Sequence, residues 1–198
     1  TKMLEEHIKL MQEHEQLKMV FVESRWIRNA ILSSGDVNSF EVKGLTAVKG
    51  LDKLGNVEDK PIKYLGSHMK QAIKAQIKSD INVLSALKKK GKRVGRLKYA
   101  SEVNSINLQQ IGVTYNILPN GIKVQGFKRS FKVFGTEQLY PVDARYEFAN
   151  AKLIKKASGY YIHVTCYVAE RTQLSSGVVK SHAVGIDLGI KTTLTTSD

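Results

Sequence analysis

Cysteine is almost absent from this chain of 198 residues: Cys166 is the single one. A lone cysteine excludes an internal disulfide and a zinc knuckle of the Cys-x-x-Cys type, so we expect no zinc in this portion. Long apolar runs are absent too, because none approaches the roughly 20 residues that span a bilayer, and no signal-peptide pattern opens the chain. The sequence therefore predicts a cytoplasmic protein without a membrane partner.

Acidic residues are scarce relative to basic ones. Eighteen Asp and Glu stand against 31 Lys and Arg, which gives a formal net charge of +13. Such an imbalance favours a polyanionic partner, with nucleic acid as the first candidate. Hydrophobic residues make up 42% of the chain, which is sufficient for a globular core.

Two segments have apolar residues at helical spacing. The first runs from Lys2 to Leu32, and Trp26 beside its apolar stripe is interpreted as a packing anchor rather than a base-stacking platform. The second runs from about Ser67, a candidate N-cap, to Leu87. Its expected buried stripe is Met69, Ile73, Ile77, Ile81, Leu84 and Leu87. Beside that stripe lies a row of like charges that an anion would stabilise, namely Lys70, Lys74 and Lys78.

The most basic stretch follows this second helix. Residues 88–98 contain two glycines, no acidic residue and seven cations, which are Lys88, Lys89, Lys90, Lys92, Arg93, Arg96 and Lys98. We interpret this stretch as a linker that contacts phosphates, which would position a nucleic acid without reading its sequence.

The period of the pattern changes to two from Tyr99 onward. Short alternating runs separated by tight turns predict antiparallel strands in a small barrel or sandwich, so the fold class is α+β. Turns are expected at 118–121 and at 156–159. The region 36–62, between the two predicted helices, is expected to hold loops and a short hairpin. Basic residues give one strand face a charge suited to a nucleic-acid backbone: Lys123, Lys128, Arg129 and Lys132.

Near the end of the chain stands Ala183-Val184-Gly185-Ile186-Asp187-Leu188-Gly189-Ile190-Lys191. As a strand it would bury one apolar face and leave Asp187 among glycines on the other, where a carboxylate calls for a cation. Three interpretations are open: the first strand of a ribonuclease H-like nuclease with Asp187 on Mg²⁺, the phosphate loop of an actin-like ATPase, or a strand whose Asp187 only caps a turn.

The order of these pieces resembles a known family. A basic helical segment is followed by Leu97-Lys98-Tyr99 and Ser101-Glu102-Val103-Asn104-Ser105-Ile106, then by Lys152-Leu153-Ile154-Lys155-Lys156-Ala157-Ser158-Gly159-Tyr160-Tyr161-Ile162-His163-Val164 and the Asp187 strand. Together these resemble the TnpB (OrfB) nucleases of transposons and their descendants, the type V CRISPR effectors. The resemblance runs from about Phe21 to the end of the chain.

The resemblance implies an RNA-guided DNA endonuclease whose partners are a guide RNA and a target DNA. Residues 1–98 would form the helical recognition region, 99–172 an OB-like β-barrel wedge, 173–181 a linker and 182–198 the start of a RuvC nuclease domain. Asp187 would be a catalytic residue and a Mg²⁺ ligand of the intact enzyme. The family's further Glu and Asp, and its zinc ribbon, are not found in this sequence, so we expect a fragment that binds nucleic acid without cleaving it.

Two other functions stay open at this point. One is a non-catalytic module, a truncated or domesticated relative that binds guide RNA and acts by binding only. The other is the ATPase, which would leave the basic helices and the wedge-like strands without a role.

Overall fold

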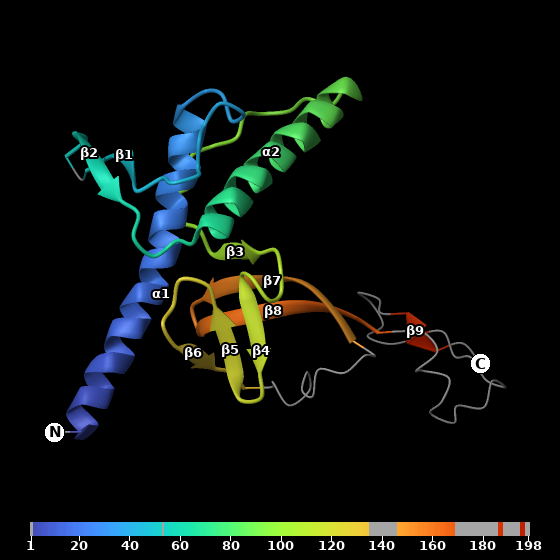
Figure 1. Cartoon of the computed structure of the whole chain (residues 1–198). Coiled ribbons are helices and arrows are strands. Elements are labelled where there is room, and N and C mark those ends of the chain that lie inside the picture. The colour runs from blue at the N-terminus through green and yellow to red at the C-terminus, as the bar shows by residue number, and fades with distance from the viewer. Residues whose placement is uncertain (1, 53, 135–145, 169–185, 188–194, 197–198) are drawn as a thin grey trace.

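The computed structural model describes residues 2–52, 54–134, 146–168, 186–187 and 195–196, with side chains of the first helix described from His14 onward. The described residues form two helices and ten strands (Figure 1). In chain order the elements are α1 (Lys2–Ser33), β1 (Ala47–Leu51), β2 (Val57–Pro61), α2 (Ser67–Lys89), β3 (Ser105–Leu108), β4 (Tyr115–Leu118), β5 (Gly121–Val124), β6 (Ser130–Lys132), β7 (Tyr146–Lys156), β8 (Gly159–Val168), β9 (Ile186–Asp187) and β10 (Thr195–Thr196).

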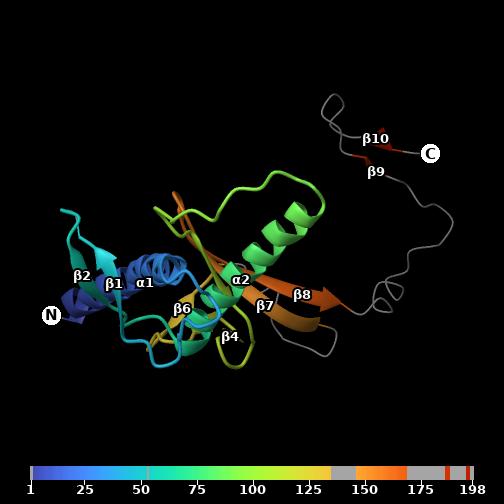
Figure 2. The same cartoon turned by 90° about the horizontal axis from the view of Figure 1, so that it is seen from above.

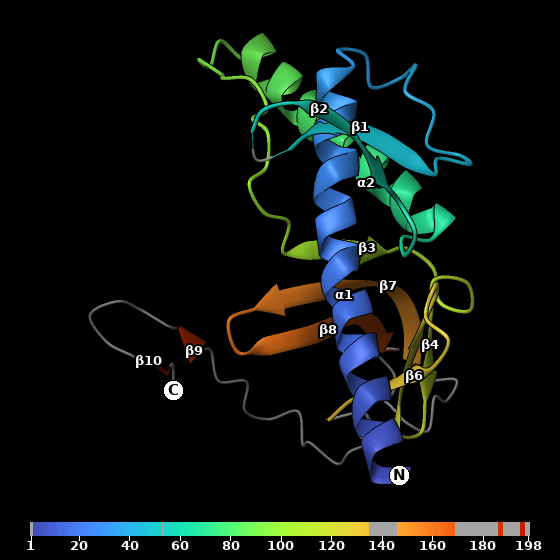
Figure 3. The same ribbon diagram turned by 90° about the vertical axis from the view of Figure 1, so that its left-hand side faces the viewer.

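Helix α1 is the element that the others pack against. From Leu17 onward its apolar stripe is buried as the spacing predicted, with Val20, Ile27 and Ile31 fully enclosed. Figures 1 and 3 show its C-terminal half beside α2 and the hairpin β1–β2, and its N-terminal half beside the larger sheets. The ring of Phe21 stacks on Tyr160 of β8, with centroids 5.7 Å apart. One helix therefore contributes to the core along both parts of the molecule.

The hairpin β1–β2 confirms the expectation of a short hairpin within residues 36–62. Its strands are antiparallel, with Val48 opposite Lys60. Asp52 shapes the turn because its Oδ1 accepts the backbone N–H groups of Leu54, at 2.7 Å, and Asn56, at 2.8 Å. These bonds, the one from Asn56 first, lower the pKa of the Asp52 carboxyl below its ordinary value.

Helix α2 departs from the predicted pattern at both ends. Its N-cap is Gly66 and not Ser67, and no side chain caps it. A Cβ at position 66 would stand 2.8 Å from Oε1 of Gln125, so a larger residue there would displace the end of the Gln125 side chain. The predicted buried stripe covers only the first half, because Met69 and Ile77 are buried whereas Ile81 and Leu87 are exposed. Figure 2 shows why: the second half of α2 extends away from α1.

Strands β3 to β8 form two three-stranded antiparallel sheets, β3-β7-β8 and β4-β5-β6, and β9 pairs with β10. Both predicted hairpin turns are confirmed, since Leu118 pairs with Gly121 and Lys156 pairs with Gly159. The sheets share one apolar core, to which they contribute Ile106, Leu108, Tyr115, Ile122, Val124, Ala151 and Leu153. The hydroxyl of Tyr115 crosses between them and donates to the carbonyl of Ala149, 2.8 Å away, at the bulge in β7. Burial raises the pKa of that hydroxyl.

The predicted α+β class is confirmed. Over the described ranges, however, none of the sheets closes into a barrel, and the strands from β3 to β8 lie in two separate open sheets. Neither of the two described helices is long and apolar enough to cross a bilayer. The predicted linker 173–181 lies outside the described residues.

A buried carboxylate ties α1 to the segment between β2 and α2. Glu23 is fully enclosed in the middle of α1. Its Oε1 accepts the backbone N–H of Lys63 at 2.8 Å, its Oε2 accepts that of Leu65 at 2.9 Å, and Tyr64 donates to both oxygens. A buried carboxylate is costly unless hydrogen bonds replace its water, and these backbone donors do so. The start of α2 is thereby fixed against α1.

Replacing Glu23 by Gln should destabilise the fold. The amide nitrogen of Gln cannot accept a hydrogen bond, so at least one buried N–H loses its acceptor, which costs about 1–3 kcal/mol. We expect a corresponding decrease in the free energy of unfolding, measured by urea titration with circular dichroism. Glu15→Gln is the control because Glu15 is exposed on the same helix and, among the described side chains, pairs only with Lys18. A Glu23→Gln midpoint equal to that of the control would contradict this role.

Candidate nucleic-acid interface

The basic segment of residues 88–98 begins where α2 ends. Gly91 follows the cap residue Lys90 with a φ of 72°, a conformation that suits glycine. The N–H of Lys92 donates to the carbonyl of Leu87 and that of Gly91 to the carbonyl of Lys88, at 3.1 and 3.0 Å. This pair of bonds is the Schellman motif, which turns the chain sharply out of a helix. The lysines of the last turn also compensate the negative end of the helix dipole.

All seven predicted cations of this segment are exposed: Lys88, Lys89, Lys90, Lys92, Arg93, Arg96 and Lys98. No acidic residue lies between Asp80 and Glu102. In the part of the chain that the structure describes, none of the seven forms an ion pair or a side-chain hydrogen bond. The described residues therefore leave this charge available to a ligand.

The far end of the segment is held by α1 and β7. The side-chain amide of Asn29 makes two bonds with Ala100, donating to its carbonyl at 3.0 Å and accepting its N–H at 2.8 Å. Arg25 donates to the carbonyl of Ser101 at 3.0 Å. Glu102 then pairs with Lys155 at 2.7 Å, and this bond lowers the pKa of the Glu102 carboxyl. The basic segment is thus fixed at both ends.

The lysine row of α2 divides into inward and outward members. Lys70 donates to the carbonyl of Leu45 at 2.5 Å, and Lys74 donates to the carbonyls of Asn38 and Phe40 at 3.0 and 2.8 Å. Burial lowers the pKa of the Lys70 ammonium, against the opposing influence of the Glu23 carboxylate. Lys78 is exposed and, among the described residues, makes no such bond. Lys70 and Lys74 brace residues 36–45, and their contact with phosphate stays a prediction.

The four cations predicted on the strand face lie around β5 and β6. Lys128, Arg129 and Lys132 are exposed, whereas Lys123 is half-buried and donates to the carbonyl of Lys128 at 2.5 Å. They lie on the β4-β5-β6 sheet and its connections, whereas the basic segment leads into β3 of the other sheet.

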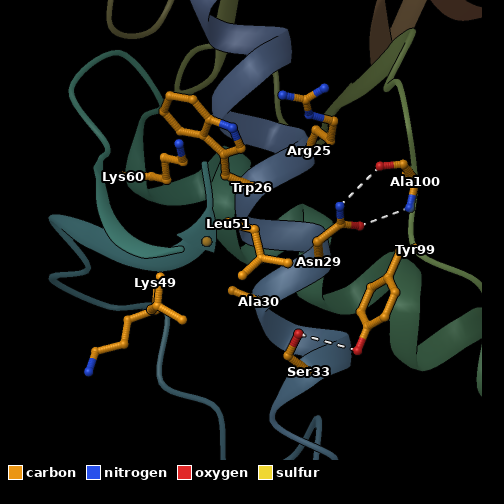
Figure 4. A pocket seen from close by; sticks show the side chains of 12 residues that line it. Arg25, Trp26, Asn29, Ala30, Ser33, Lys49, Leu51, Lys60, Tyr99 and Ala100 are labelled. Carbon is orange, nitrogen blue, oxygen red and sulfur yellow. Dashed lines mark hydrogen bonds between the residues drawn. The ribbon is translucent and has the colours of Figure 1, made fainter. Parts of the chain in front are cut away.

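A pocket of about 660 Å³ lies where α1, the hairpin β1–β2 and the end of the basic segment meet (Figure 4). Trp26 and Tyr99 lie at opposite ends of its lining, with Leu51, Ala30 and Asn29 between them. The ammonium of Lys60 lies 5.7 Å from the centre of the Trp26 ring. The hydroxyl of Ser33 contacts that of Tyr99 at 3.4 Å.

Sequence reasoning missed this pocket, because it interpreted Trp26 only as a packing anchor. The indole is half-buried and also lines the cavity, so both roles are present. The available signal was local: Trp26 stands next to Arg25, and Tyr99 directly follows the basic segment. What brings them together is the Asn29–Ala100 clamp across 71 positions, which no local pattern indicates.

Asp187 lies in the short strand β9, whose backbone pairs antiparallel with β10 so that Asp187 stands opposite Thr195. The Asp187 side chain lies outside the described residues, and its role as a metal ligand stays a prediction. Among the side chains that are described, no three His, Cys, Asp or Glu residues come together as a metal site.

No protein-family model, curated protein or solved structure is similar enough to this chain to give a match. The family resemblance therefore rests on the sequence motifs alone.

Two lysines of α2 allow a matched test of the inward and outward positions. Lys74→Met removes the donor to two backbone carbonyls, so we expect the free energy of unfolding to fall by about 1 kcal/mol. Lys78→Met should leave it within about 0.5 kcal/mol of the wild type. Both values can be measured by urea titration. Equal stabilities of the two variants would show that Lys74 does not brace residues 36–45.

Proposed function

We propose that this chain is part of an RNA-guided DNA endonuclease of the TnpB type, acting in the cytosol, and that its own task is to hold the guide RNA. The observation that carries the proposal is the basic segment, which is fixed at both ends and exposes seven cations. It contains no acidic residue, and none of the seven has an intramolecular partner among the described residues. Such a segment binds phosphates electrostatically, whatever the base sequence.

In this proposal base pairing between guide and target reads the DNA sequence, and the protein supplies charge and shape. The two helices and the hairpin β1–β2 form the recognition region. The two three-stranded sheets form the wedge, an OB-like unit with cations Lys128, Arg129 and Lys132 on its exposed side. Short antiparallel strands joined by tight turns support that assignment.

Cleavage is assigned to the intact parent enzyme. There Asp187 would contribute one carboxylate to a Mg²⁺ site, and Mg²⁺ would activate water for phosphodiester hydrolysis. Metal ions that handle a phosphodiester need several anionic ligands, and the described residues do not supply them. The role of this chain in the proposal is therefore nucleic-acid binding.

Removing charge from the basic segment should weaken RNA binding and its dependence on salt. The variant carries Lys89→Gln, Lys92→Gln, Arg93→Gln and Arg96→Gln. Each lost phosphate contact should reduce the slope of log affinity against log salt by about 0.7 for single-stranded RNA. Fluorescence anisotropy of a labelled RNA over a series of salt concentrations measures both affinity and slope.

The control variant removes the same number of charges at exposed positions outside the segment, namely Lys18, Lys43, Lys63 and Lys152. It should keep most of the slope, because net charge acts only at long range and is screened by salt. Equal slopes for the two variants would remove the basic segment from the interface.

The guide itself can be identified by isolating the chain from its native host and sequencing the RNA that accompanies it. We expect one discrete structured transcript with a variable end, and its loss from the quadruple basic-segment variant. Bulk ribosomal fragments in both preparations would contradict a guide-binding function, because they indicate binding to any RNA.

A further inference from the structure

The pocket between α1, the hairpin β1–β2 and Tyr99 has the composition of a base-stacking site. Its walls are mainly apolar and include two aromatic side chains, Trp26 and Tyr99, that come from distant parts of the chain. Tyr99 is 64% exposed and Trp26 half-buried, so both rings are reachable from outside. Leu51 and Val57, also in the lining, are about two-thirds exposed. An apolar surface of this kind is unusual on a protein unless something covers it.

The charges of the lining specify what could cover it. Three cations line the pocket and no acidic residue does. Lys60 is paired with Glu58. Lys49 is exposed and unpaired within the described ranges, and Arg25 uses Nη1 for the carbonyl of Ser101. An occupant must therefore combine a flat apolar part with negative charge, as a nucleotide does.

The pocket is continuous with the basic segment. Lys98 is the last cation of that segment, and the next residue, Tyr99, forms the pocket wall. A strand whose phosphates follow residues 88–98 therefore arrives with its bases at Tyr99. Duplex RNA keeps its bases stacked and paired, so only a single-stranded stretch could place a base here.

The polar groups of the lining do not read base identity. The amide of Asn29 is committed to Ala100 in both directions, and the hydroxyls of Ser33 and Tyr99 contact each other. With these neutral side chains already committed, stacking in the pocket is tolerant of sequence.

We propose that this pocket stacks unpaired bases of a single-stranded RNA, without preference for the base, at the point where the RNA leaves the basic segment. This inference rests on the proposed guide-RNA function and adds a site to it that the basic segment does not require. Trp26 and Tyr99 are the stacking groups, one at each end of the pocket.

The chain carries its own reporter for this site, because Trp26 is the single tryptophan. A base stacked in the pocket should quench its fluorescence. The experiment titrates the full chain with a single-stranded RNA of about 12 nucleotides, a length within the usual range for such sites, and with the same RNA as a duplex. Tryptophan emission reports the pocket, while anisotropy of a labelled RNA reports binding anywhere. We expect quenching by the single strand and none by the duplex.

Substitutions at Tyr99 separate the ring from its hydroxyl. Tyr99→Ala should reduce the affinity for single-stranded RNA about tenfold, within the range for loss of one stacking ring. Tyr99→Phe keeps the ring and should bind like the wild type. Tyr167→Ala is the matched control, since Tyr167 is similarly exposed, at 61% against 64%, and does not line the pocket.

The outcomes distinguish this site from the proposed function. RNA that binds by anisotropy while Trp26 emission stays constant, or a Tyr99→Ala affinity equal to that of Tyr167→Ala, would overturn the pocket and leave guide binding intact. RNA that does not bind at all would overturn both. DNA of the same sequence quenching more strongly than RNA would show that the occupant is not RNA.

Discussion

The carboxylate of Glu23 is the constraint on which the rest of this arrangement depends. It is fully buried in α1, and its oxygens accept backbone N–H groups from Lys63 to Leu65. Ionised groups are buried only when hydrogen bonds or opposite charge replace water. The backbone N–H groups around this carboxylate must therefore stay within hydrogen-bond distance of it. It therefore holds the end of the hairpin β1–β2 and the start of α2 against α1. That hairpin lines the pocket, and the basic segment begins where α2 ends.

The same reasoning explains how the lysines of α2 act. Periodicity correctly placed Lys70, Lys74 and Lys78 on neighbouring turns of one helix, beside an apolar stripe. It could not show that residues 36–45 pass over that face and present backbone carbonyls to the first two ammonium groups. Like charges along a helix repel one another unless negative groups lie beside them. The carbonyl oxygens of a loop can offset this repulsion, as an external anion would. Only the position of the loop decides between the two, and that position depends on long-range packing.

Features that depend on residues close together in the sequence could be predicted, whereas features that depend on long-range packing could not. The hairpin turn at 156–159, the strand periodicity and the first half of α2 follow from patterns within a few residues, and the structure confirms them. The exposure of Ile81 and Leu87 was not predictable, because spacing shows which side chains share a face and not whether another element covers it. The pocket is the extreme case, since its walls at Trp26 and Tyr99 come together through long-range contacts such as the clamp at Asn29.

The fixed ends of the basic segment have a physical consequence for binding. A disordered basic tail can bind phosphates, but it loses conformational entropy on doing so, which reduces the affinity. Here the Schellman turn at Gly91 and the Asn29–Ala100 clamp hold the ends of the segment before any ligand arrives. Part of that entropy has therefore been lost on folding. Folding also holds the cations of the segment close together, where they repel one another. A polyanion reduces this electrostatic repulsion, so the arrangement favours a ligand with several phosphates over one with a single charge.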